Sequence, residues 1–336
     1  MGISGLLQTL KSITHPVHVR DLEGLTVGVD AYCWLHRGAY SCSTEICRGE
    51  FTDKFVRFCM RRIELLLSHG VTPWVVFDGA PLPMKHGVNK ARRDARAANL
   101  AKAEAAMAAG EPIAAQQHYA RSVAITHELA RMFIRSLARR GIKFVVAPYE
   151  ADAQLAFMSQ QGLIDAIITE DSDCLPFCCK RMLFKLENDG SAQEIRARDL
   201  SSNENPSLAG WTYSMFLDMC LLAGCDYLPR VHGLGIGTAH KLVARHRSHK
   251  PMLAALRASR KFALPDDFED RFEMARLTFR HQRVYDPRSR CVVPLMPLPP
   301  SARERQNLDF LGPELPPHIA EAIANSTMDP YTREPY

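Results

Sequence analysis

Four short apolar runs recur along the first half of the chain, and each ends beside an acidic residue. They are LTVGVDA (25–31), VTPWVVFDG (71–79), KFVVAPYEAD (143–152) and DAIITEDSD (165–173). Runs of this length that are rich in Val, Ile and Phe are typical of strands buried on both faces of a parallel sheet. Because helical patterns separate the runs, we predict an α/β fold with a mostly parallel central sheet flanked by helices.

Helical patterns fill much of the remaining sequence. A helix is expected around 52–69, and the Ala-, Arg- and Lys-rich stretch that starts near 88 has high helix propensity. The loop signal AAGEP separates that stretch from a second predicted helix, 113–140, so the two would form a hairpin inserted between strands. Helices at 213–224 and 237–247 are expected to flank a Gly-rich turn. The Pro-rich last forty residues are expected to wrap over the domain in extended form.

Acidic residues follow the apolar runs, and one more lies in the later segment AGCDYL. Since ligands bind at the carboxyl ends of strands in open parallel sheets, we expect these acids to converge on one spot. Carboxylates packed so closely repel one another unless they are protonated or neutralised by cations. The seven residues are Asp30, Asp78, Glu150, Asp152, Asp171, Asp173 and Asp226.

Two pairs in this set, Glu150 with Asp152 and Asp171 with Asp173, are two residues apart. In an extended segment such residues point the same way, so each pair is expected to bind one cation. No His or Cys accompanies either pair, and oxygen-only ligation suits Mg²⁺ or Mn²⁺. Two such ions would support hydrolysis of a phosphodiester. The alternative for any single Asp is a turn former or a helix N-cap.

A cluster of basic residues directly follows Asp78 and the loop APLPM. Lys85 and Arg92 are seven positions apart and would share one helical face, placing two cations where they could neutralise a scissile phosphate. The alternative is a solvated helix face. The cluster consists of Lys85, Lys90, Arg92, Arg93 and Arg96.

The Gly-rich turn GLGIG (233–237) is a poor dinucleotide fingerprint, because a helix and not a strand precedes it. Its open backbone N–H groups could instead contact phosphate, with Lys241 and Arg245 following on one helical face. The alternative is an interhelical turn that binds no ligand.

Composition adds little to these patterns. The chain has 336 residues, 46% of them hydrophobic, which allows one large domain or two smaller ones, and its net charge of +5 barely favours a polyanionic partner. The ten cysteines lack regular spacing, so reduced thiols are expected, and Cys174, Cys178 and Cys179 lack the second pair that zinc would need. No apolar run approaches the roughly 18–20 residues that span a membrane, and the N-terminus lacks a signal-peptide pattern.

Several of these motifs resemble those of the flap endonuclease superfamily of structure-specific 5′ nucleases. They are the MGI-x-GLL start, VFDG (76–79), EADAQLAF (150–157), TEDSD (169–173) and GCDYL (224–228). Within the superfamily, DAYCWLHRGA (30–39) and VAPYEADAQLAF (146–157) resemble the eukaryotic exonuclease I branch, and the tail 309–336 resembles its plant and algal form.

The resemblance implies a domain organisation as well as a PIN-like 5′-nuclease fold. The expected parts are an N-terminal nuclease region (1–99), a helical arch (80–140), an internal nuclease region (141–230), a helix–two-turn–helix module (220–258) and a C-terminal wrapping segment (259–336).

The resemblance also assigns roles to individual residues. All seven acids would bind metal, and the catalytic set would be Asp78, Lys85, Arg92, Glu150 and Asp173. Tyr32 and His36 would meet the frayed 5′ nucleotide, and a K⁺ ion would help the Gly-rich turn to hold duplex phosphate. The remaining DNA-binding residues would be Gly2, Phe58, Arg61, Arg93, Arg96, Gly233, Gly235, Gly237 and Lys241.

The activity implied is that of a Mg²⁺-dependent 5′→3′ exonuclease on duplex DNA, with 5′-flap cleavage, acting in the nucleus in mismatch repair and end resection. A dedicated flap endonuclease is one alternative, although QNLDF (306–310) does not complete the sliding-clamp peptide usual in that family. A non-catalytic DNA-end binding scaffold is another, and it would not need seven acids. Family members usually continue into a long tail that contacts mismatch-repair proteins, and this sequence ends at Tyr336, so we expect those contacts to be absent or the chain to be a fragment.

Overall fold

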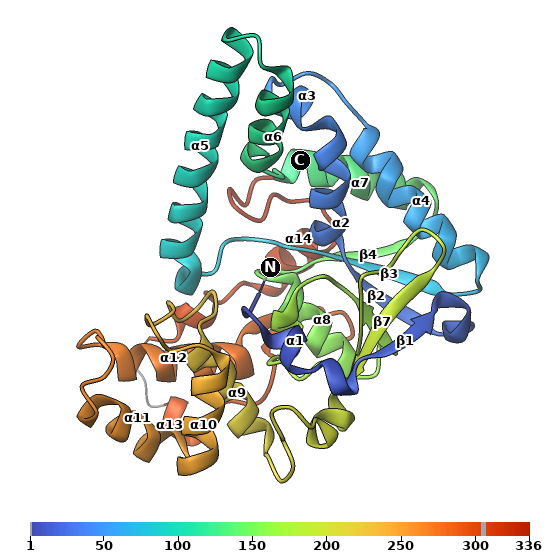
Figure 1. The fold of residues 1–336 in the computed structure, drawn as a ribbon. Helices are drawn as coiled ribbons and strands as arrows, with labels where there is room; N and C mark the ends of the chain where they lie inside the picture. Colours follow the sequence, from blue (N-terminus) through green and yellow to red (C-terminus); the bar gives the residue numbers. More distant parts are fainter. Residues whose placement is uncertain (1, 304–306) are drawn as a thin grey trace.

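The structure is a computed structural model that describes residues 2–303 and 307–336, so Gln306 of the QNLDF segment lies outside it. Within the described residues a seven-stranded sheet forms the centre of the molecule (Figure 1), in the order β1-β7-β6-β5-β2-β3-β4. The strands are β1 (His15–His18), β2 (Thr26–Asp30), β3 (Thr72–Phe77), β4 (Lys143–Val146), β5 (Ala166–Ile168), β6 (Arg181–Phe184) and β7 (Ser191–Arg196).

The strands from β6 to β4 run parallel to their neighbours, and β7 and β1 extend the sheet in antiparallel fashion. This confirms the predicted α/β class and the four predicted strands, although each strand is shorter than its apolar run. Because β2, β3, β4 and β5 point the same way, the loops that follow them open at one edge of the sheet.

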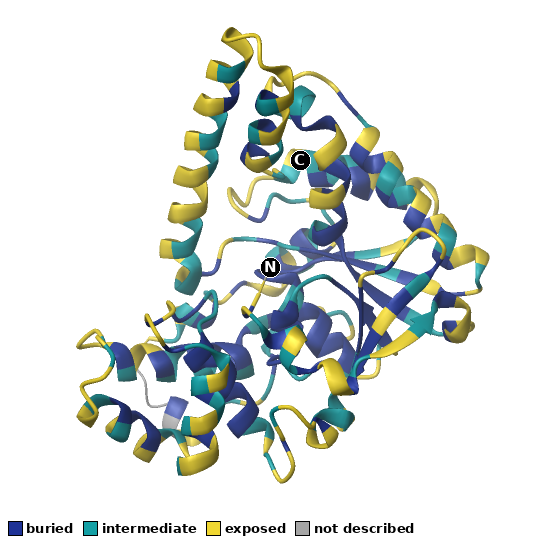
Figure 2. Cartoon of the chain, viewed as in Figure 1, coloured by how far each residue is buried: buried dark blue, intermediate teal, exposed yellow. Residues whose placement is uncertain are grey.

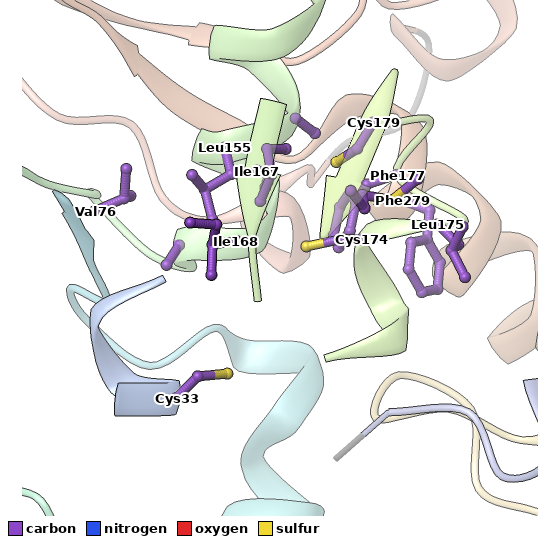
Figure 3. Close-up of a cluster of buried hydrophobic side chains, with 14 of the residues drawn as sticks. Cys33, Val76, Leu155, Ile167, Ile168, Cys174, Leu175, Phe177, Cys179 and Phe279 are labelled. Carbon is purple, nitrogen blue, oxygen red and sulfur yellow. The ribbon is translucent and has the colours of Figure 1, made fainter. Parts of the chain in front are cut away.

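Helices cover both faces of the sheet (Figure 1). On one side lie α2 (Ala31–Ala39), α4 (Lys54–Ser68) and α7 (His127–Arg139), and on the other lies α8 (Ala151–Gln160). Figure 3 shows part of the buried core, where Leu155 of α8 packs near Ile167 and Ile168 of β5. The short helices α1 (Leu6–Thr9) and α3 (Ser43–Cys47) complete the N-terminal half.

A pair of helices, α5 (His86–Ala108) and α6 (Pro112–Ser122), stands away from the sheet and is largely exposed (Figures 1 and 2). Its small core comprises Ala103, Ala115 and Tyr119. The prediction of one helix over 113–140 was wrong, because α6 ends at Ser122 and α7 begins at His127. The β-branched residues between them disfavour helix, and the Thr126 hydroxyl accepts the N–H of Leu129 at 3.3 Å as an N-cap.

A second group of helices lies beside the sheet (orange in Figure 1): α9 (Tyr213–Ala223), α10 (Ile236–His246), α11 (His249–Ala258) and α12 (Phe268–His281). Helices α9 and α10 confirm the predicted pair around the Gly-rich turn. The hairpin β8 (Arg283–Asp286)–β9 (Cys291–Pro294) and the short helix α13 (Pro300–Arg303) follow.

The last forty residues are not wholly extended as predicted, because they contain α14 (Pro317–Ala324). Prolines lie at its start, where the missing N–H group is not needed for the helical hydrogen bonds. Of the helices described, none has both the length and the apolar character needed to cross a membrane.

Candidate active site

A cleft of about 460 Å³ opens at the carboxyl edge of the sheet, and the predicted acids converge on it. Its walls come from the loops after β2, β3, β4 and β5, from α5, from the α9–α10 connection and from the C-terminus. The acids in its lining are Asp30, Asp78, Glu150, Asp152, Asp171 and Asp226. The seventh, Asp173, is buried next to the cleft, with 3% of its surface exposed.

Helix starts hold these carboxylates in place. Asp30 Oδ1 accepts the N–H of Tyr32 at 3.0 Å at the start of α2, and Asp78 Oδ1 accepts the N–H of Ala151 at 2.8 Å at the start of α8. The N-cap role considered for single aspartates therefore coexists with membership of the cluster.

The prediction that the two acid pairs lie in extended segments was wrong. Glu150 precedes α8 and Asp152 lies in its first turn. Asp171 caps a 3₁₀ turn at residues 172–174 that contains Asp173, and its Oδ1 accepts the N–H of Asp173 at 3.0 Å. Acids favour helix starts because the free N–H groups there attract negative charge, and this preference overrides the extended conformation.

The electrostatics of the cluster disfavour bare negative charge. Desolvation raises the pKa of Asp78 to about 7, and the charge of Asp30 adds to the rise. Desolvation also raises the pKa values of Asp30, Asp152 and Asp173, with repulsion from Asp171 contributing to each. Asp173 Oδ1 is buried and finds no hydrogen-bond partner among the residues described.

These observations fit a site for divalent cations. An unpartnered buried carboxylate oxygen beside further carboxylates is an arrangement that a hard cation would stabilise. Across residues 2–303 and 307–336, no group of three or more His, Cys, Asp or Glu side chains is arranged so that it could hold a metal ion by itself. Mg²⁺ does not need such a group, because it keeps several waters and is bound by one or two carboxylates together with phosphate oxygens.

Thiol and hydroxyl donors orient two of the carboxylates, a feature that the sequence patterns did not predict. Asp30 Oδ2 accepts from Cys33 Sγ at 2.7 Å and from Thr169 Oγ1 at 3.0 Å. Cys174 Sγ donates to Asp152 Oδ1 at 3.2 Å. Of the three cysteines considered for zinc, Cys174 and Cys179 are buried thiols and Cys178 is half-buried.

Lys85 and Arg92 both reach the acids. Lys85 Nζ lies 2.5 Å from Glu150 Oε1 and 3.2 Å from Asp226 Oδ2, and an Arg92 guanidinium nitrogen lies 2.8 Å from Asp226 Oδ1. Burial opposes the charge on Lys85, but attraction to Glu150 and Asp226 outweighs it and raises the pKa of the ammonium group. Burial likewise opposes the charge on Asp226, and Lys85 and Arg92 nevertheless lower its pKa. At these two positions the basic cluster is not merely a solvated face.

Tyr227 is a further polar residue at the site. Its hydroxyl donates to Glu150 Oε2 and also lies 3.3 Å from Gln282 Oε1, and Lys85 Nζ lies 5.2 Å from its ring centroid. The signal in the sequence was its position directly after Asp226 in GCDYL.

The predicted DNA-binding residues divide among three surfaces. Tyr32, His36, Arg93 and Arg96 line the cleft itself. Gly2 lies against its acids with φ +84°, and a Cβ atom there would come within 2.3 Å of Asp171 Oδ1, so the close approach requires glycine.

The other two surfaces lie outside the cleft. Phe58 and Arg61 line a groove between α2 and α4, the α4 groove, whose rim also carries Arg37, Lys54 and Arg57. Gly233, Gly235, Gly237 and Lys241 lie at the α9–α10 turn. There Gly235 has ordinary φ and ψ angles, and a Cβ on it would make ordinary contact with an Arg230 guanidinium nitrogen at 3.5 Å, so neither the backbone nor the available space requires glycine at this position.

Comparison with known proteins gives a consistent result. The XPG N-terminal domain matches residues 1–99, and the XPG I-region matches residues 141–226. Exonuclease 1 of Arabidopsis thaliana is 44% identical over 336 residues, which is all of this chain and 45% of that protein. Exodeoxyribonuclease 1 of Saccharomyces cerevisiae is 38% identical over 89% of this chain and 43% of its own length. The chain therefore spans less than half the length of these two relatives.

A shorter relative is covered more fully. DNA damage-inducible protein DIN7 of Saccharomyces cerevisiae is 35% identical, over 89% of this chain and 70% of its own length. Among solved structures, the catalytic core of Rad2 in complex with DNA substrate aligns with a TM-score of 0.62 at 20% identity, over 83% of this chain and 86% of that one. Flap endonuclease-1 from Methanococcus jannaschii aligns with a TM-score of 0.56 at 20% identity, over 83% and 84% of the two chains. At these identities the structural matches establish the fold.

Proposed function

The chain belongs to the XPG/flap endonuclease superfamily, and on that basis we propose that it is a metal-dependent, structure-specific 5′ nuclease acting in DNA repair. Its activity would be 5′→3′ exonucleolytic on duplex DNA, with cleavage of 5′ flaps. One observation carries the proposal: six carboxylates and two cations, Lys85 and Arg92, line a single cleft, and a seventh carboxylate, Asp173, is buried beside it. Such a site neutralises charge on both sides of a phosphodiester, which suits its hydrolysis.

The acidic cluster would hold two Mg²⁺ ions, with Mn²⁺ able to substitute. When bound, the ions supply an activated water and stabilise charge on the leaving oxygen. The chain's own contribution is to keep the carboxylates fixed. The N–H groups of Tyr32 and Ala151 and the thiols of Cys33 and Cys174 orient individual carboxylate oxygens. Asp173 brings a buried carboxylate that lacks a protein partner in the part of the chain described.

Lys85 and Arg92 would act on the substrate phosphate. In the structure they neutralise Glu150 and Asp226. A phosphate that enters between the acids and α5 offers these cations a new anionic partner through charge-assisted hydrogen bonds. Because the pKa of Lys85 is raised, this residue stays protonated at neutral pH and can favour negative charge that develops on the phosphate during cleavage.

DNA would contact all three predicted surfaces. The cleft offers Tyr32 and His36 to a frayed 5′ nucleotide, the α4 groove offers Phe58 and Arg61 at the bend, and the α9–α10 turn offers open backbone groups to duplex phosphate. A K⁺ ion at that turn belongs to the same proposal. The assignment favours the nucleus as the location. Contacts with mismatch-repair proteins would need the long tail into which family members usually continue.

A direct test uses a nicked duplex whose nicked strand is labelled at its 5′ end in one preparation and at its 3′ end in another. With Mg²⁺ we expect early release of the 5′ label and stepwise shortening of the 3′-labelled strand, and with EDTA no cleavage. A single cut confined to added flaps would favour a dedicated flap endonuclease. Binding without cleavage in Mg²⁺ would favour a DNA-end scaffold and overturn the proposal.

A further inference from the structure

The cleft contains a second aromatic pair in addition to Tyr32 and His36. His127 begins α7, and Tyr331 lies near the C-terminus, 204 positions further along the chain, yet both line the cleft. Their ring centroids are 4.6 Å apart with an interplanar angle of 73°. Tyr331 keeps 56% of its surface exposed, whereas most large apolar side chains are buried. An exposed aromatic ring at a charged cleft offers a flat surface to a ligand.

Tyr331 is presented by an ordered turn, the C-terminal hairpin (residues 328–336). Asp329 Oδ1 accepts the N–H of Tyr331 at 2.7 Å and that of Thr332 at 2.9 Å, and Met328 pairs with Pro335. The Arg131 guanidinium lies 3.4 Å from the Tyr336 ring centroid and so pins the hairpin to α7. Figure 1 shows the C-terminus beside α6 and α7, on the same side of the sheet as α2. The ring is therefore held in place before any ligand arrives.

The surroundings of Tyr331 suit a nucleotide. Arg96 of α5 lines the same cleft and could contact a phosphate next to a stacked base. Burial and the charges of Asp78 and Asp329 raise the pKa of Tyr331, so its hydroxyl is neutral at physiological pH and does not repel phosphate. Tyr32 lines this cleft as well, so the two aromatic pairs face the same space.

We propose that Tyr331 stacks on an unpaired base of the substrate strand in the cleft and that His127 orients its ring. The inference rests on the proposed nuclease function and adds to it a further positioning residue, Tyr331, for the unpaired 5′ nucleotide that the family resemblance assigns to Tyr32 and His36. Base–aromatic stacking tolerates any sequence because every base has a flat face. The contact would help to position the terminal nucleotide, while the acids and Lys85 act on the phosphate.

The test measures cleavage and stacking on the same DNA, a duplex whose frayed 5′ nucleotides include 2-aminopurine. Tyr331→Ala should raise KM by roughly 10- to 100-fold, the usual range for one lost stacking contact, and leave kcat at saturation within a few-fold. It should also weaken the quenching of 2-aminopurine on binding in Ca²⁺, with Tyr32 and His36 accounting for the quenching that remains. Tyr331→Phe keeps the ring and should behave like the unmodified protein. Phe51→Ala removes a ring that is 85% exposed and absent from the described cleft lining, and serves as the matched control.

Folding defects are separated from lost stacking by Tyr331→Leu. Leucine keeps apolar bulk against His127 but has no aromatic face, so it should resemble Tyr331→Ala in KM and quenching while unfolding at the unmodified protein's temperature. Unchanged KM and quenching in Tyr331→Ala would overturn the inference while leaving the nuclease proposal intact. An equal rise in KM for Tyr331→Phe would also overturn it, because the contact would then be the hydroxyl. If the unmodified protein does not cleave the DNA at all, the proposed function itself fails.

Discussion

The carboxylates of the cleft stand on the carboxyl edge of a buried sheet, whereas the cations that face them are carried by the exposed helix α5 and the turn before it. Asp30, Glu150 and Asp173 are all buried. Asp30 and Glu150 occupy the N-cap positions of α2 and α8, and Asp173 lies in the 3₁₀ turn at residues 172–174. In α5, by contrast, the buried residue among those described is Ala103. The acidic and the basic sides of the candidate active site are thus held by very different amounts of packing.

The difference in packing arises because the acids repel one another, whereas the cations are attracted to the acids. Like-charged groups push apart, so only a rigid frame can hold the acids together without a cation. The cations are attracted to that frame, and the Lys85 and Arg92 ion pairs tie the start of α5 to it. At its far end the helical pair relies on a small core around Tyr119. We therefore expect local stability to be high at the sheet edge and low in the helical pair.

The largest effect should come from the acid side of this comparison. Asp173→Asn or Asp173→Ala should slow cleavage by about 10³-fold or more, because a metal ion contributes several kcal/mol to such a reaction. DNA binding should persist, since the phosphate contacts lie on other surfaces. Single-turnover cleavage and fluorescence anisotropy would measure the two quantities separately.

The stability of the Asp173 variants without metal tests whether the acids repel one another. Removing a carboxylate whose pKa is raised should leave the metal-free protein as stable as before or more stable. Near-normal cleavage by Asp173→Asn in Mg²⁺ would contradict the metal assignment, and a large loss of thermal stability in EDTA would show that Asp173 is needed mainly for packing.

The next effect belongs to the cation side. Lys85→Ala and Arg92→Ala should each lower the single-turnover rate at saturating DNA by roughly 10²–10³-fold, the usual loss for one group that stabilises developing charge. Their effect on affinity should be smaller. Lys102→Ala, on an exposed position of the same helix, is the matched control and should leave the rate unchanged. If the Lys85 and Arg92 variants lost affinity for DNA but kept the unmodified rate at saturation, both residues would belong to a solvated basic helix face and would have no role in cleavage.

Raising the pH should destabilise the metal-free protein, and binding of Mg²⁺ to the acids should restore its stability. Asp78 has a pKa of about 7 in the fold, against an ordinary value of 3.8, so between these pH values the folded protein holds a proton that the unfolded chain releases. The metal-free protein should therefore lose stability as pH rises through this window. Mg²⁺ replaces the protons, so the rise in melting temperature that it causes should be a few degrees larger at a pH of about 8 than at about 6.

Differential scanning calorimetry with Mg²⁺ or EDTA at both pH values would measure this shift. The Asp173→Asn variant should show a smaller Mg²⁺-induced rise. If the rise in melting temperature were independent of pH, the acids would not be exchanging protons for metal.

The smallest effect concerns the helical pair alone. Tyr119 is 2% exposed and belongs to its small core, so Tyr119→Ala should loosen α5 and α6 and speed their amide hydrogen exchange. Exchange in β2 and β3 should stay unchanged, and cleavage should fall by less than about tenfold because the ion pairs still hold the start of α5. Mass spectrometry of exchanged peptides would measure both regions. Equal acceleration in the sheet would show that the two regions unfold together.

The sequence by itself was sufficient for the neighbouring strands β5, β2, β3 and β4 and for most of the acid set, whereas β1, β6 and β7 were not predicted. Buried parallel strands show as continuous apolar runs, and acids at their ends must open on the same edge, so the positions of Asp30, Asp78 and Asp171 along the chain are enough to place them there. The break between α6 and α7 was missed because a capping residue, Thr126, competes with helix propensity over only a few positions.

What only the tertiary structure decided is which distant residues meet. Lys85 bridges Glu150 and Asp226, Tyr227 donates to Glu150, and Tyr331 returns from the C-terminus to His127. No local pattern specifies such contacts, because they depend on how packed elements and the C-terminal segment pass over one another. Local propensities and strand ends set the position of the acids, and long-range packing brought the cations and the aromatic rings to them.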